Sequence, residues 1–141
     1  MKKKVAIIGA GIAGLTLGNL LKKNPQISFK IYERSDGLVI KEGYGIQLSV
    51  NCISILRELD FDLIDTKKMF HPQKLNFLSI DNEKICELDL IKFNTLNNKY
   101  TTLRRSVLVE FLREKLFKEN LKFNKDIKKI SELKDKILIN F

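Results

Sequence analysis

The sequence predicts an α/β fold built on a parallel β-sheet, and three observations predict it. An apolar run from Lys4 to Ile8 leads directly into a glycine-rich turn. The turn is followed by a segment with helical periodicity, Gly11 to Lys23, and then by a second apolar run, Ser28 to Tyr32. A strand, a helix and a strand within about thirty residues form a βαβ unit, whose two strands are parallel.

Each element of this unit has recognisable ends. The continuous apolar character of Lys4 to Ile8 is typical of a strand buried on both faces of a parallel sheet. The helix is predicted to end at Asn24-Pro25, because proline cannot continue it. Ser28 to Tyr32 alternates apolar and polar residues and stops at Glu33. We therefore expect a parallel sheet covered by helices.

The rest of the chain departs from strand–helix alternation. Arg34 to Ile46 is rich in glycine without periodicity, which predicts a loop. Leu75 to Ile80 and Lys84 to Leu88 flank Asp81-Asn82-Glu83 and predict an antiparallel hairpin, inserted at about residues 70–100. Further helices are predicted at Val50 to Leu59 and Leu103 to Asn120, and short strands at Leu121 to Phe123, Asp126 to Ile130 and Lys136 to Phe141.

Length, charge and cysteine content exclude several classes of protein. The 141 residues, 44% of them hydrophobic, allow one domain with a buried core. No apolar run approaches the roughly 20 residues of a membrane span. The net charge of +9 comes from lysines interleaved with acidic residues, so we expect no nucleic-acid partner. Cys52 and Cys86 lie far apart, which argues against a disulfide or metal site and favours the cytoplasm.

The glycine-rich turn carries the clearest functional signal. Gly9, Gly11 and Gly14 have the spacing G-x-G-x-x-G between a predicted strand and a predicted helix. In such turns the backbone can approach a pyrophosphate, and the helix N-terminus favours its negative charge. Glu33 ends the next strand, where a carboxylate accepts hydrogen bonds from ribose hydroxyls. The sequence thus predicts a Rossmann-like dinucleotide-binding fold, favours FAD or NAD over NADP, and leaves FAD and NAD open.

Three further stretches resemble one particular family. They are IYERS at residues 31–35, GYGIQLSVN at residues 43–51 and LRRSVLVEFL at residues 103–112. In this order they are similar to the N-terminal signatures of the class A flavoprotein monooxygenases, and the second is similar to the branch of salicylate hydroxylase and zeaxanthin epoxidase. The resemblance covers nearly the whole chain.

The resemblance implies FAD as the cofactor and a role for each matching residue. The three glycines of the turn would hold the pyrophosphate, Glu33 the adenosine ribose, and Arg34 would lie beside the adenine. Gly43 and Gly45 would bring backbone close to the flavin or ribityl side, and Arg105 would contact the phosphate and ribityl region. No catalytic side chain is assigned, because in this family the flavin carries the chemistry.

The same resemblance implies that residues 1–141 are the N-terminal part of an FAD-binding domain, incomplete at its C-terminal end. An Asp-Gly and a Gly-Asp motif of the family would follow Phe141. The hairpin at residues 70–100 would belong to the substrate-side subdomain. The whole enzyme would use NAD(P)H and O₂ to hydroxylate an aromatic or similar small molecule, and this chain would be inactive until a C-terminal part, or a partner chain, completes it.

Other classes of protein stay open at this point. A segment of another FAD- or NAD-dependent oxidoreductase, such as a reductase, dehydrogenase or halogenase, shares the glycine turn. An NAD-dependent enzyme predicts more strand–helix alternation than the hairpin permits. A non-enzymatic truncated relic and a basic binding module are alternatives of a different kind.

Overall fold

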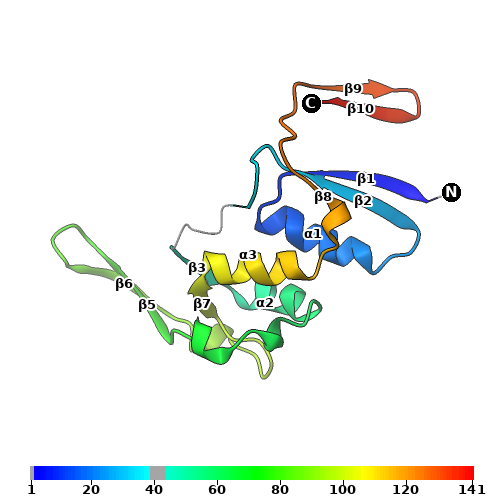
Figure 1. Ribbon diagram of the computed structural model, residues 1–141. Helices are drawn as coiled ribbons and strands as arrows, with labels where there is room; N and C mark the ends of the chain where they lie inside the picture. Colours follow the sequence, from blue (N-terminus) through cyan, green and yellow to red (C-terminus); the bar gives the residue numbers. More distant parts are fainter. Residues whose placement is uncertain (1, 39–43) are drawn as a thin grey trace. The chain divides into compact units, whose positions relative to one another are not determined.

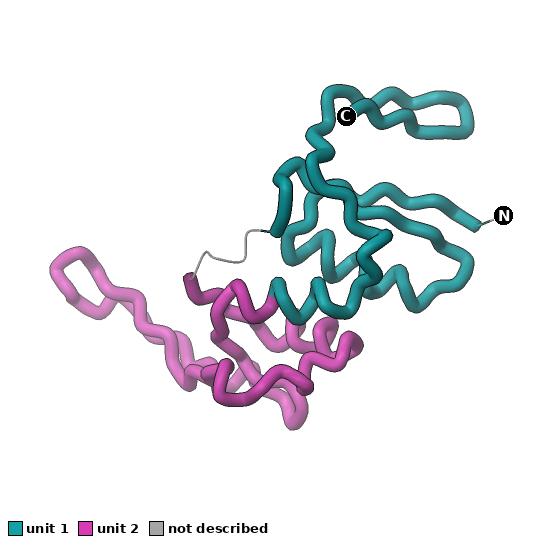
Figure 2. Tube along the Cα trace, viewed as in Figure 1, with its two compact units in different colours: residues 1–41, 109–141 teal, residues 42–108 magenta. Residues whose placement is uncertain are grey.

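The computed structural model describes residues 2–38 and 44–141, which divide into two compact units (Figures 1 and 2). Unit 1 consists of residues 1–41 and 109–141, and unit 2 of residues 42–108. Unit 2 is therefore inserted in sequence between the two parts of unit 1. The boundary falls within helix α3 (Arg105–Glu114).

Unit 1 is built on a three-stranded parallel sheet with the strand order β1-β2-β8 (Figure 1). β1 (Lys3–Ile8) pairs with β2 (Ile27–Tyr32), and β2 pairs with β8 (Leu121–Lys122). Helix α1 (Ile12–Lys22) connects β1 with β2 and packs against both strands. The predicted βαβ unit and parallel sheet are confirmed.

The burial of β1 differs from the prediction of a strand buried on both faces. Ile7 is buried and Val5 half-buried, whereas Lys4, Ala6 and Ile8 are exposed. Successive side chains of a strand point to opposite faces, so a covering layer on one face buries only every second residue. The same alternation along β2 places Phe29 and Ile31 in the core.

Helix α1 approaches the sheet closely at Gly18. A Cβ atom there would lie 2.8 Å from Ile31 Cδ1 and 3.1 Å from Phe29 Cε2. At the next residue of the helix, the buried Asn19 amide donates hydrogen bonds to Leu15 O at 2.9 Å and to Leu112 O at 2.8 Å. These contacts fix α1 between the sheet and the end of α3.

We expect Gly18→Val to destabilise unit 1 by about 1–3 kcal/mol, because the added side chain overpacks this contact. The free energy of unfolding can be measured by urea denaturation. Gly37→Ala is a suitable control, since a Cβ at Gly37 would meet no atom within 4 Å. An unchanged midpoint for Gly18→Val would show that α1 does not pack on β2 this closely.

Unit 1 also contains a C-terminal hairpin of β9 (Lys129–Leu133) and β10 (Lys136–Asn140). The strand predicted at Asp126 to Ile130 is wrong in its bounds. β9 and β10 are joined by a two-residue turn after Leu133, and in this register the last residue of β10, Asn140, pairs with Lys129. β9 therefore begins at Lys129. The preceding residues 125–127 lie beside the end of β2 instead.

Unit 2 contains a mixed set of short elements. β3 (Gly45–Leu48) and β4 (Met69–Phe70) both pair antiparallel with β7 (Thr101–Arg104), which is the central strand. The predicted hairpin is confirmed as β5 (Lys74–Leu78) and β6 (Lys84–Asp89), and the predicted helix as α2 (Val50–Arg57). Short 3-10 helices lie at Phe61–Leu63, Thr66–Lys68 and Ile91–Phe93, and at Lys118–Asn120 in unit 1.

Two predicted boundaries are corrected by β3 and β7. Residues 45 and 46, predicted as loop, belong to β3, and Leu103, predicted as the start of a helix, belongs to β7. Thr101 and Leu103 alternate inward as strand residues, at 1% and 4% exposure. Helix α3 begins only at Arg105 and ends at Glu114, short of the predicted Asn120. Leu103 is extended because it pairs with Ile46, although the sequence around it has helical periodicity.

Candidate functional site

The turn between β1 and α1 depends on Gly9 for its conformation. Gly9 has φ +93°, a value that residues with a side chain rarely adopt. Its N–H donates a hydrogen bond to Tyr32 O at 2.8 Å, which joins the turn to the end of β2. The turn therefore lies at the carboxyl ends of two parallel strands, where open α/β sheets bind ligands.

Gly11 and Gly14 differ in what the fold requires of them. A Cβ at Gly14 would lie 2.0 Å from Gly9 O, so glycine is needed there for the helix to approach the turn. Gly11 has φ −76°, which any residue can adopt, and a Cβ there would meet no atom within 4 Å. Close packing and backbone conformation therefore do not require glycine at position 11, although glycine is an acceptable N-cap residue. The space over Gly11 is open to a molecule from outside the chain.

The N-terminus of α1 is suited to an anion. Gly11 is the N-cap residue and provides no side-chain cap, and the first turn contains no acidic residue. The intrahelical ladder starts with Leu15 N donating to Gly11 O at 2.9 Å. The N–H groups of the preceding helical residues therefore point out of the helix end, where the helix dipole favours negative charge.

Glu33 is held by the backbone on both carboxylate oxygens. Oε2 accepts a hydrogen bond from Ala10 N at 2.8 Å, and Oε1 accepts one from Ser35 N at 3.0 Å. Burial acts to raise the pKa of this carboxyl, but the hydrogen bonds from Ala10 and Ser35 outweigh it and hold the pKa below its ordinary value. Glu33 thus carries a fixed negative charge at the glycine turn.

Acid should loosen this turn. A carboxyl whose pKa is lowered by folding stabilises the folded state at higher pH, and that stabilisation is lost as the pH falls through the folded-state pKa. We expect the Ala10 amide resonance to titrate below the ordinary pKa range of glutamate, and Glu33→Gln to abolish that titration. The measurement is NMR of the backbone amide across acidic pH. Titration of Ala10 at or above the ordinary range would contradict the bond to Glu33.

A pocket of about 180 Å³ lies beside Glu33. It brings together Gly9, which the resemblance assigns to the pyrophosphate, and Glu33 and Arg34, which it assigns to the adenosine end. Its other lining residues are Ile8, Tyr32, Lys125, Asp126 and Ile127. The last three come from the segment after β8, and sequence reasoning missed them. Only the topology could have identified them, since β8 is the third parallel strand of the sheet and this segment follows its carboxyl end.

The predicted flavin-side residues Gly45 and Arg105 lie in unit 2. Gly45 is paired with Arg104 between β3 and β7, and a Cβ on it would be 3.9 Å from Thr102 Cγ2, an ordinary contact. Arg105 N donates to Tyr44 O at 3.0 Å, and its guanidinium lies 5.8 Å from the centre of the Tyr44 ring. Tyr44 is 54% exposed and was not predicted as a site residue. Gly43 lies outside the described residues.

The sequence-predicted site residues thus form two groups. Unit 1 brings together the glycine turn, Glu33 and Arg34, and unit 2 brings together Gly45 and Arg105. Within the described residues, no group of three or more His, Cys, Asp or Glu side chains is placed to hold a metal ion. In the same part of the chain, no helix is long and apolar enough to cross a bilayer.

Sequence comparison relates the chain to nucleotide-dependent enzymes. Residues 7–39 match the NAD(P)-binding Rossmann-like domain family. Over 82 residues the chain is 42% identical to the FAD-dependent monooxygenase pytG of Aspergillus terreus. This alignment covers 58% of the chain and 23% of the relative, so the chain spans only a part of the length of that protein.

Structural comparison gives the same fold over the full chain. Klebsiella pneumoniae HpxO, solved with FAD and uric acid, matches 99% of the chain with a TM-score of 0.75 and 19% identity. The 2,6-dihydroxypyridine-3-hydroxylase of Arthrobacter nicotinovorans matches 100% with a TM-score of 0.72 and 15% identity. The chain covers 35% and 33% of these two proteins. The predicted α/β fold is therefore confirmed.

Proposed function

The chain is similar to the N-terminal segment of the class A flavoprotein monooxygenases, and from this premise we propose that it binds FAD as part of such an enzyme. The observation that carries the proposal is the open position at Gly11, a glycine that the described fold does not require. It lies at a helix N-terminus and next to Ala10, whose N–H binds the Glu33 carboxylate. Backbone donors for a pyrophosphate, in the turn, and an acceptor for ribose hydroxyls, at the end of β2, are thus joined by a hydrogen bond.

The proposed role of each residue follows the resemblance. In unit 1, Gly9, Gly11 and Gly14 would hold the pyrophosphate, Glu33 the adenosine ribose, and the exposed Arg34 side chain the adenine. In unit 2, Gly45 would allow the flavin or ribityl part to approach the backbone. Arg105 would bind the phosphate and ribityl region, since a guanidinium can donate paired hydrogen bonds to phosphate oxygens.

The proposed reaction is the NAD(P)H- and O₂-dependent hydroxylation of an aromatic or similar small molecule. The bound flavin would supply the redox chemistry, and the residues of this chain would bind and orient it. The hairpin β5–β6 would belong to the substrate side of the enzyme. The chain spans about a third of the solved structures that it matches, so the activity would need further sequence, in the same chain or in a partner chain. We place the protein in the cytoplasm.

The experiment is a titration of the purified 141-residue chain with FAD, ADP and FMN. We expect saturable binding of FAD, and the visible absorption band of the flavin should remain with the protein after desalting. ADP should compete with FAD, because the proposed contacts of unit 1 are to the adenosine and pyrophosphate. FMN, which lacks the adenosine, should compete poorly. A folded chain that binds neither FAD nor ADP in the millimolar range would overturn the proposal.

Competition between FAD and NAD⁺ distinguishes the proposed flavoprotein from a nicotinamide-dependent enzyme. Residues 7–39 match a family described as NAD(P)-binding, and the glycine turn serves both cofactors. We expect FAD to bind more tightly than NAD⁺, because the resemblance assigns Gly45 and Arg105 to the flavin side of the cofactor. Tighter binding of NAD⁺ would favour a nicotinamide-dependent enzyme instead.

A further inference from the structure

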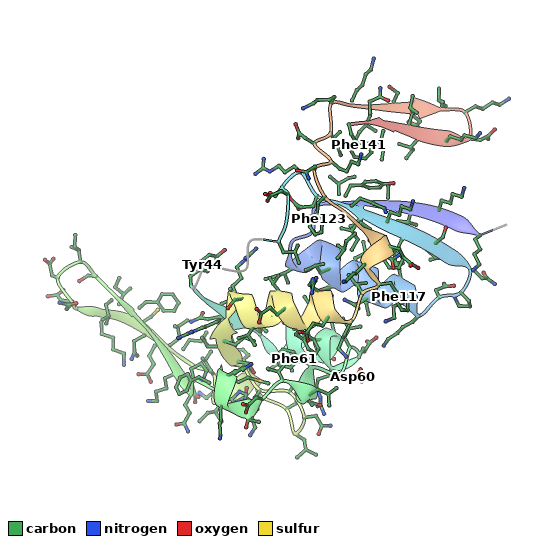
Figure 3. The ribbon with its side chains drawn as sticks, viewed as in Figure 1. Tyr44, Asp60, Phe61, Phe117, Phe123 and Phe141 are labelled. Carbon is green, nitrogen blue, oxygen red and sulfur yellow. The ribbon has the colours of Figure 1, made fainter. Side chains whose placement is uncertain are left out.

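The aromatic ring of Phe141 lies against two residues that line the pocket beside Glu33. The Phe141 and Tyr32 ring centres are 4.7 Å apart with an interplanar angle of 32°, and Lys125 Nζ is 5.6 Å from the centre of the Phe141 ring. Tyr32 and Lys125 both line the pocket, whereas Phe141 does not. Figure 3 shows Phe141 on the side of its hairpin that faces the β1–β2 sheet.

The wall of the pocket formed by residues 125–127 is joined to the end of β2 through the backbone. Asn124 adopts a left-handed conformation, φ 54°, where the chain leaves β8. The segment is then held by two backbone hydrogen bonds, from Asn124 N to Ser35 O at 3.0 Å and from Lys125 N to Glu33 O at 2.8 Å. Lys125 and Asp126 are exposed, so little burial adds to these bonds.

The hairpin β9–β10 joins the far end of this wall to Phe141. Lys128 N donates to Asn140 O at 2.8 Å, directly after the pocket residue Ile127 and directly before Phe141. The wall is therefore fixed at its start by Glu33 and Ser35, and at its end by a hairpin whose last residue packs on Tyr32. Phe141, outside the pocket, thus contacts one residue on each side of it.

We propose that Phe141 is a positioning residue for this pocket. Its ring packs on Tyr32 and beside Lys125, and so keeps residues 125–127 against Glu33 and Arg34. An aromatic pair with a cation beside it gives this contact a preferred geometry as well as buried area. If the pocket takes the adenosine end of FAD, which rests on the function proposed above, Phe141 supports adenosine binding without contacting the ligand.

Hydrogen exchange of the backbone amides tests the positioning role without any ligand. In Phe141→Ala we expect the Asn124 and Lys125 amides to exchange faster by about tenfold or more, because local opening no longer breaks the ring contact. Amides in the centre of β1 and β2 should keep their protection, and the urea midpoint should change little. Phe141→Leu, which keeps apolar contact but loses the ring, should give an intermediate acceleration.

Phe117→Ala is the matched control. Phe117 also belongs to unit 1, is exposed, and has a lysine, Lys22, with Nζ 4.9 Å from its ring centre, but it does not line the pocket. We expect normal exchange at Asn124 and Lys125 in this variant. Unchanged exchange of these amides in Phe141→Ala and Phe141→Leu, or the same acceleration in Phe117→Ala, would overturn the proposal.

The affinity for ADP is a second measurement of the role of Phe141. Phe141→Ala should weaken ADP binding by about tenfold, roughly what the loss of one aromatic pair produces, whereas Phe117→Ala should leave it unchanged. If the unsubstituted chain does not bind ADP, the proposed function fails while amide exchange still decides the role of Phe141. If ADP binds equally to both variants and exchange is unchanged, the role of Phe141 fails and the proposed function stands.

Discussion

Gly14→Ala is expected to destabilise the chain more than any other single methyl group added to the glycine turn. The new Cβ would lie 2.0 Å from the carbonyl oxygen of Gly9, and a backbone atom cannot rotate away as a side chain can. Helix α1 would have to lift from the turn, at a cost above the about 1–3 kcal/mol of ordinary overpacking. Urea unfolding followed by far-UV circular dichroism measures the loss.

Gly11→Ala is the matched control for this experiment. It adds the same methyl group three residues earlier, where no atom lies within 4 Å of the new Cβ. Because alanine is a poorer N-cap residue than glycine, we expect a cost of up to about 1 kcal/mol. Equal destabilisation by the two substitutions would mean that the turn does not have the described geometry.

Gly11→Val is expected to leave the chain folded and to remove FAD binding. The backbone of Gly11 is extended, with φ −76° and ψ −177°, and accepts a branched side chain. The side chain would occupy the space over the N-terminus of α1 that we assign to the pyrophosphate. We expect the dissociation constant for FAD and for ADP to rise by about 100-fold or more, equivalent to about 2.7 kcal/mol.

The control for Gly11→Val is the same substitution at a glycine away from the proposed pyrophosphate site. Gly37→Val adds the same group in the loop after Glu33, where its Cβ would be equally free of neighbours. It should bind FAD as the unsubstituted chain does. Retention of full affinity in Gly11→Val, with normal circular dichroism, would exclude the phosphate assignment at this turn.

The sequence predicted the elements that have a strong local signal. In the β1–α1–β2 unit, the β5–β6 hairpin and α2, each strand or helix has a clear hydrophobic pattern and clear ends. All three are confirmed. β7 was missed because its four residues adjoin the helical pattern of α3, and only its pairing with β3 and β4 makes it a strand. β4, two residues long, is likewise defined by its partner and not by its own sequence.

The candidate site divides in the same way. The glycine turn and Glu33 were predicted from spacing, and the pocket brings Gly9, Glu33 and Arg34 together. The hydrogen bond from Ala10 to Glu33 joins residues 23 positions apart, and Lys125 lies in the segment after a third strand, so neither has a local sequence pattern. The resemblance to the N-terminal segment of class A flavoprotein monooxygenases agrees with the relatives and the fold, while the individual site residues remain predictions.

The insertion of unit 2 between the two parts of unit 1 sets an order of events during synthesis. A ribosome completes β1, α1 and β2 early, but β8, which pairs with Ile31 and Tyr32 on the other edge of β2, emerges only after all of unit 2. Until then the backbone groups on that edge of β2 are without their strand partner, and uncovered strand edges invite pairing with other chains. We therefore expect the newly made chain to be prone to aggregate while residues 42–120 are being translated, and slower translation of this stretch to lower the soluble yield.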